Sequence, residues 1–83
     1  MTPMSTDEAD RHVRHALAQV VPGVDLDSLG PKDSLRDLLE MDSLDFLAFV
    51  EQLSAETHVR IDEDDYPKLT TLDSCLAFLG STG

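Results

Sequence analysis

The sequence is short of cations, and this shortage argues against two classes of partner. It has six Lys and Arg residues against 17 Asp and Glu, so its formal net charge is −11. Nucleic-acid binding depends on cationic groups that neutralise phosphates, and anionic membranes attract basic segments. We therefore expect neither nucleic acid nor a membrane among the partners.

Long apolar runs and paired cysteines are also lacking. No stretch approaches the roughly 18 apolar residues that a membrane-spanning helix needs, and the first residues lack the basic start and apolar run of a signal peptide. The single cysteine, Cys75, can form no internal disulfide and no Cys-rich zinc module. These absences favour a cytoplasmic protein.

The chain is small and poor in aromatic residues. It has 83 residues, with three Phe, one Tyr and no Trp, and a chain of this size hides only about 60% of its unfolded surface on folding. Such a composition supplies a core of Leu and Val but too little room for a substrate-enclosing enzyme cleft. We expect one acidic, monomeric domain over residues 5–80, with tails at 1–4 and 81–83 and with basic proteins as partners.

Residues 5–21 and 71–79 predict the first and last helices. In the first, apolar side chains recur on one helical face, and Ser5 and Glu8 fit a capping box at its start. In the last, apolar side chains again recur at helical spacing, and Gly80 is expected to end the helix.

Residues 43–57 predict a second main helix, and the acidic run from residue 62 predicts a short helix through residue 69. Residues 22–41 lack periodicity, yet their apolar side chains are expected to pin this long connection onto the helices. These side chains are Val24, Leu26, Leu29, Leu35, Leu38 and Leu39. Because no segment alternates as a strand would, the predicted fold class is all-α, a small four-helix bundle with three main helices and one short helix.

The apolar positions of helix 43–57 point in two directions, since successive residues are about 100° apart. The predicted core face comprises Phe46, Leu47, Val50 and Leu53. A second strip, off this face and beside Ser43, comprises Leu44, Ala48, Glu51 and Ala55. An apolar strip that the core does not use, next to a polar group at a helix end, predicts a docking surface.

Ser43 has two interpretations. Serine is a favoured helix N-cap, and the other Asp-Ser-Leu triplets, at 27–29 and 33–35, make the triplet a weak signal. However, a helix N-terminus also favours an attached phosphate. Residues 37–59 contain six acids and no Lys or Arg, so they steer a basic partner towards this helix end.

Catalysis and metal binding are the weaker alternatives. A serine nucleophile needs a histidine base within reach, but His58 lies at the far end of the helix that Ser43 begins. His12 and His15 lie three residues apart on the first helix, and two ligands without a third are typical of a solvated surface. Cys75 lies on the apolar stripe of the last helix, which favours a buried core residue over a reactive thiol. We therefore expect no catalytic residue and no metal.

The run from Ser34 to Leu47, SLRDLLEMDSLDFL, resembles the modification-site signature of acyl carrier proteins. The similarity continues through residues 61–65 and 69–72 into the last helix, and it covers about residues 5–79. The resemblance implies that Ser43 carries 4′-phosphopantetheine through a phosphodiester and that the chain has no catalytic activity. The thiol of this arm would hold acyl groups as thioesters.

The resemblance also implies the partners and how they dock. A phosphopantetheinyl transferase would move the arm from coenzyme A with Mg²⁺, and basic patches on synthases, ligases or acyltransferases would dock to helix 43–57. The matching docking positions are Asp42, Leu44, Asp45, Ala48 and Glu51. The implied role is a freestanding carrier in fatty-acid, polyketide or related biosynthesis.

Some positions depart from the family pattern. Glu40 stands where the family often has Gly, so the loop before Ser43 is expected to turn differently. Ala48 replaces a frequent carboxylate, and Thr57 replaces a common aromatic core residue. The alternative to a carrier is a small acidic helical interaction module that never bears an arm.

Overall fold

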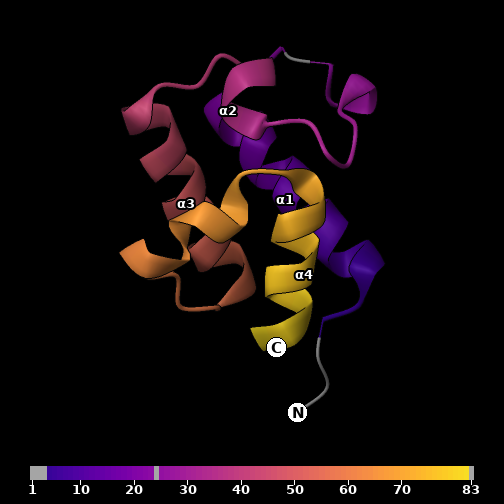
Figure 1. Cartoon of the computed structure of the whole chain (residues 1–83), viewed down its shortest axis with the longest axis vertical. Coiled ribbons are helices and arrows are strands. Elements are labelled where there is room, and N and C mark those ends of the chain that lie inside the picture. The colour runs from indigo at the N-terminus through magenta and orange to yellow at the C-terminus, as the bar shows by residue number, and fades with distance from the viewer. Residues whose placement is uncertain (1–3, 24, 83) are drawn as a thin grey trace.

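The computed structural model describes residues 4–23 and 25–82 and contains helices over most of that length (Figure 1). In chain order the elements are α1 (Thr6–Val20), η1 (Leu26–Ser28), α2 (Leu35–Leu38), α3 (Ser43–Thr57), η2 (Glu63–Leu69) and α4 (Leu72–Thr82), where η marks a 3₁₀ helix. The predicted all-α bundle is confirmed, with α1, α3 and α4 as its main helices. The domain boundaries at residues 5 and 80 stay a prediction.

The bundle is held together by α1, which packs against both α3 and α4, while η2 packs against α4 (Figure 1). Each main helix buries one apolar face, as the helical spacing requires. The buried side chains of these three helices are Ala9, Val13, Ala16, Leu17, Phe46, Phe49, Val50, Leu53, Leu72, Cys75, Phe78 and Leu79.

The ends of α1 follow from local sequence. Ser5 is the N-cap, and its hydroxyl oxygen accepts the backbone N–H of Glu8 at 3.2 Å. The Ser5 hydroxyl donates to the Glu8 carboxylate, also at 3.2 Å. On the outer face, Arg14 Nε donates to both carboxylate oxygens of Asp10 at 3.0 Å, as their four-residue spacing favours.

The connection between α1 and α3 has more structure than the sequence predicts, because it contains η1 and α2. Leu29, Leu35 and Leu39 are buried, and Leu26 packs half-buried against the core, so the expected anchoring by leucines is confirmed for these four. It is wrong for Leu38, which is 45% exposed because the single turn of α2 buries only the side of Leu35. Val24 lies outside the described residues.

Backbone hydrogen bonds fasten this connection to the start of α4. The N–H of Leu35 donates to the carbonyl of Thr70 at 2.9 Å, and the N–H of Asp73 donates to the carbonyl of Pro31 at 2.8 Å. Between these bonds, Ser34 and Thr71 form an isolated antiparallel bridge. The first residue of α2 is thereby fixed against the segment that joins η2 to α4.

The predicted end of the last helix at Gly80 is wrong, since α4 continues to Thr82. A glycine ends a helix by taking a positive φ. Among the described glycines, the one with positive φ is Gly23, which follows α1. Gly80 keeps the helical conformation, and the carbonyl of Met4 lies near the position that its Cβ would take.

Candidate functional site

The start of α3 is capped by Asp42 and not by Ser43. The Asp42 carboxylate accepts the backbone N–H of Asp45 at 2.8 Å, which is the standard side-chain cap of a helix N-terminus. Ser43 is therefore the first helical residue, and its side chain is exposed. Within the described part of the chain, no protein group hydrogen-bonds to its hydroxyl.

The serines of the other two Asp-Ser-Leu triplets are engaged in local hydrogen bonds. The Ser28 hydroxyl donates to the carbonyl of Asp25 at 2.8 Å. The Ser34 hydroxyl caps α2 by accepting the backbone N–H of Asp37 at 3.4 Å. Of the three triplet serines, Ser43 alone offers a hydroxyl that has no structural use in the described residues.

An open cleft of about 490 Å³ lies beside Ser43, between α2, α3 and η2. Its lining residues are Arg36, Ser43, Phe46, Leu47, Tyr66, Pro67 and Thr70. The rings of Phe46 and Tyr66 pack edge to face, with centroids 5.6 Å apart. Above the Phe46 ring lies the Arg36 guanidinium, whose Cζ is 5.6 Å from the ring centroid. The cleft is thus mainly apolar, with the Arg36 cation and the Ser43 hydroxyl in its lining.

The loop that leads into this site turns at Glu40, whose φ is +54°. The N–H of Met41 donates to the carbonyl of Arg36 at 2.9 Å and closes the turn after α2. This combination of a left-handed residue and a bond back into the helix is a common helix C-cap, which glycine favours. The loop therefore makes a left-handed turn of the kind that glycine favours, with a glutamate under backbone strain.

The second strip of α3 is exposed as predicted: Leu44, Ala48, Glu51 and Ala55 all face away from the core. Leu44 is 75% exposed, the largest exposure among the big apolar side chains of the described residues. Asp45, Ala48 and Glu51 also line a shallow groove between α3 and α1. Of the predicted docking residues Asp42, Leu44, Asp45, Ala48 and Glu51, Asp45 is half-buried and the other four are exposed.

The predicted core face of α3 is wrong at Leu47, which is 39% exposed and lines the cleft at Ser43. The fully buried Phe49 takes its place. The observed buried residues, which include Phe49, span a narrower arc of the helix than the predicted set with Leu47. This narrower apolar face is the one that packs against α1.

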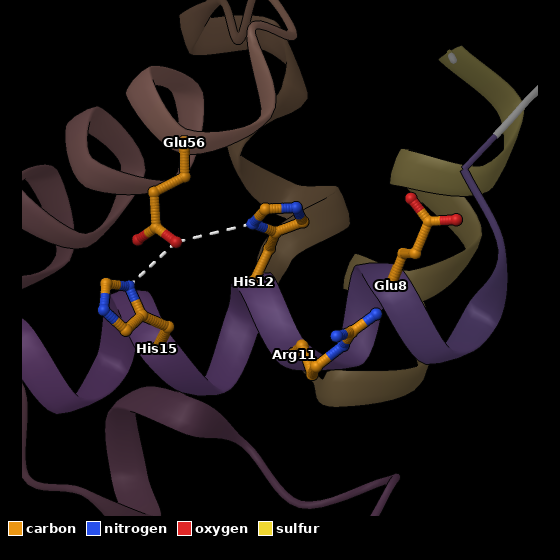
Figure 2. A pocket seen from close by; sticks show the side chains of 5 residues that line it. All are labelled: Glu8, Arg11, His12, His15 and Glu56. Atoms are coloured by element: carbon orange, nitrogen blue, oxygen red, sulfur yellow. Dashed lines mark hydrogen bonds and ion pairs between the residues drawn. The ribbon is translucent and has the colours of Figure 1, made fainter.

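His12 and His15 are not free surface residues, because both contact Glu56 of α3 (Figure 2). The Glu56 Oε1 atom lies 2.8 Å from His15 Nδ1 and 3.4 Å from His12 Nδ1, and Gln52 donates to the other carboxylate oxygen at 3.0 Å. Burial opposes ionisation of Glu56, but the hydrogen bonds from His15, Gln52 and His12 outweigh it and lower its pKa below the ordinary 4.5. This cluster joins α1 to α3.

His12 and His15 bind Glu56, and Cys75 is a core residue. Within residues 4–23 and 25–82, no group of three or more His, Cys, Asp or Glu side chains has an arrangement that would hold a metal ion. The three histidines are absent from the lining of the cleft at Ser43. Cys75 is fully buried, and burial raises the pKa of its thiol to about 12, so it is inert as a nucleophile at neutral pH.

The residues at the start of α3 fit a covalently attached phosphate group. An exposed serine hydroxyl can be esterified without disturbing the core, and Ser43 lies at a helix N-terminus, where the dipole favours negative charge. A guanidinium borders the same cleft. The apolar cleft wall can cover the first part of a chain that leaves the serine.

Comparisons with known proteins point to the same chemistry. The family model described as "Phosphopantetheine attachment site" matches residues 13–79. A curated relative, the "Acyl carrier protein" of Desulforapulum autotrophicum, is 28% identical over 67 residues, which are 81% of this chain and 87% of that protein. None of the helices in the described part of the chain is long and apolar enough to cross a bilayer.

Proposed function

This chain belongs to the phosphopantetheine attachment-site family, which includes the acyl carrier proteins, and on this premise we propose that its arm is attached at Ser43. Members of this family carry 4′-phosphopantetheine covalently and act as carriers, not as catalysts. Acyl groups travel on the thiol of the arm as thioesters. Ser43 is the point from which this chain would present them to other enzymes.

The observation that carries the assignment is the free hydroxyl of Ser43. Esterification removes the proton that a serine hydroxyl donates and weakens its oxygen as an acceptor, whereas Ser43 makes no such bond because Asp42 is the cap. Ser28 would lose its bond to the Asp25 carbonyl, and the bond from the Asp37 N–H to Ser34 would be weakened. Modification at Ser43 therefore costs the fold least.

The charge around Ser43 supports the proposed partners. Asp42 and Asp45 flank the serine, Glu51 follows on the exposed strip, and Leu44 projects between them into solvent. A partner with an apolar pocket and a rim of Lys or Arg fits this surface. We assign this partner surface to phosphopantetheinyl transferases and to the synthases, ligases or acyltransferases of fatty-acid, polyketide or related biosynthesis.

The experiment that tests the assignment is intact mass spectrometry after incubation with coenzyme A, Mg²⁺ and a promiscuous phosphopantetheinyl transferase. The wild type and the control variant Ser34→Ala are expected to gain one phosphopantetheine mass, and Ser43→Ala is expected to gain none. A loaded Ser43→Ala variant would overturn the assignment to this serine. A wild type that never gains the arm, although folded, would favour the small acidic interaction module instead.

A further inference from the structure

The edge of the cleft beside Ser43 contains a single cation. Arg36 is the last Lys or Arg before residue 60, and residues 37–59 between them hold six carboxylates. Arg36 and Ser43 come from different helices, α2 and α3, yet they line the same cleft. The tight turn at Glu40 and the bond from the Met41 N–H to the Arg36 carbonyl hold the two helix ends together.

Arg36 is positioned but not neutralised. Its guanidinium lies over the Phe46 ring, which is only 7% exposed and so gives it a fixed support. In residues 4–23 and 25–82, no carboxylate lies within ion-pair distance of Arg36, although Arg14, Arg60 and Lys68 all have such a partner. A cation over a ring keeps its in-plane N–H donors available to an anion at its edge.

A phosphodiester on Ser43 would need such a partner. It would add a negative charge between Asp42 and Asp45, where repulsion from both carboxylates opposes it. The backbone N–H of Asp45, a natural donor to a phosphate at this helix end, already donates to the Asp42 carboxylate. Arg36 is the one cationic donor in the cleft lining, and a guanidinium matches a phosphate with two parallel hydrogen bonds.

We propose that the Arg36 guanidinium, held over Phe46, pairs with the phosphodiester of the group attached to Ser43. This inference rests on attachment at Ser43. This ion pair would neutralise the phosphodiester charge, which lies beside acidic side chains. It would also keep the start of the arm at the cleft edge. Arg36 is thus a positioning residue for the prosthetic group.

The test compares arm-carrying wild type with arm-carrying Arg36→Gln and with the control Arg60→Gln. Arg60 pairs with Asp62 on an exposed loop after α3, so its replacement makes the same charge change away from Ser43. Intact mass first verifies that each sample carries one arm. The ³¹P NMR shift of the phosphodiester is then recorded at low salt and at about 1 M salt, where the Debye length is about 3 Å.

We expect the ³¹P shift of Arg36→Gln to differ from that of the wild type at low salt, and Arg60→Gln to match the wild type. High salt should move the wild-type shift to that of Arg36→Gln. Equal shifts in the wild type and Arg36→Gln at low salt, with the arm present, would overturn the pairing and leave the attachment site intact. An arm found on another residue would overturn both.

A second measurement needs no variant. In the wild type, the Nε–H NMR signal of Arg36 is expected to shift when the arm is added, while that of Arg60 stays in place. If the Arg36 signal is the same with and without the arm, the pairing is wrong whether or not Arg36→Gln folds.

Discussion

The Asp42 carboxylate accepts the backbone N–H of Asp45 at 2.8 Å, so Asp42 and not Ser43 caps α3. Because Asp42 caps α3, the Ser43 hydroxyl keeps no structural task within the described chain and stays exposed. With the proposed attachment at Ser43, capping and modification are divided between two neighbouring residues. Variants of Asp42, Ser43, Leu44 and Leu53 test this division and the exposed and buried faces of α3.

Replacement of the Asp42 cap should destabilise the protein more than replacement of Ser43. Asp42→Ala is expected to lower the free energy of unfolding by about 0.5–2 kcal/mol, the usual loss for a helix N-cap. Ser43→Ala should change it by less than about 0.5 kcal/mol, because an exposed first-turn serine makes no bond here. Urea denaturation of the arm-free variants measures both, and a larger loss for Ser43→Ala would contradict the division.

Leu44→Ala should impair docking while leaving the fold intact. Leu44 is 75% exposed, so its truncation is expected to cost well under 1 kcal/mol of stability. Because Leu44 is the proposed apolar anchor of the docking surface, its truncation should nonetheless slow loading by a transferase roughly tenfold or more. Interface anchors are worth about 2 kcal/mol or more. Urea melts and initial loading rates measure the two effects separately.

The matched control for Leu44 is Leu53→Ala on the same helix. Leu53 is fully buried, so its truncation should cost about 2–5 kcal/mol, while the fraction that remains folded loads at the normal rate. If Leu44→Ala unfolded as early as Leu53→Ala, the assignment of Leu44 to an exposed surface would be wrong.

Glu40→Gly should stabilise the protein. Glu40 has φ of +54°, a conformation that costs most L-residues about 1–2 kcal/mol and costs glycine little. After the larger chain entropy of glycine is subtracted, we expect a gain of about 0.5–1 kcal/mol relative to Glu40→Gln, which removes the same charge. Glu51→Gly, in the interior of α3, should instead lose about 1 kcal/mol relative to Glu51→Gln.

Acid should weaken the contact between α1 and α3 through Glu56. The folded state lowers the Glu56 pKa below 4.5, so its stabilising contribution is complete above that pH and is lost as the pH falls through the lower, folded pKa. Between about pH 5 and pH 3, the free energy of unfolding should fall more steeply for the wild type than for Glu56→Gln. Glu51→Gln, which removes an exposed carboxylate from the same helix, should keep the wild-type slope.

Salt should raise the melting temperature. The net charge of −11 opposes the compact state by self-repulsion, and salt at 0.1 M screens charges beyond about 10 Å. We expect the melting temperature to rise between very low salt and about 0.2 M. A flat or falling melting temperature would mean that local ion pairs outweigh the repulsion.

Local signals predict the helices well. The bounds of helix 43–57 and the Ser5 cap are as expected, since capping residues and apolar spacing act over only a few residues. The choice between Leu47 and Phe49 for the core is different, because both fit a helical face and only the position of α1 decides which is buried. Gly80 stays helical for a comparable reason, as a glycine permits a helix end without requiring one.

The exposed strip beside Ser43 could be predicted from the sequence, but the contacts around it could not. The Asp42 cap competes with an equally plausible Ser43 cap, and the sequence alone does not distinguish two adjacent capping residues. The pairing of His12 and His15 with Glu56 joins side chains that are over 40 residues apart in the chain, so it depends on how α1 packs against α3. No local pattern indicates such a contact.

The backbone bonds that tie Leu35 to Thr70 and Asp73 to Pro31 have a kinetic consequence. They adjoin two residues of the cleft lining, Arg36 and Thr70, so that side of the cleft cannot separate from the start of α4 without breaking main-chain bonds. If the two bonds break together, the amide protons of Leu35 and Asp73 should show the same protection from deuterium exchange after correction for their intrinsic rates.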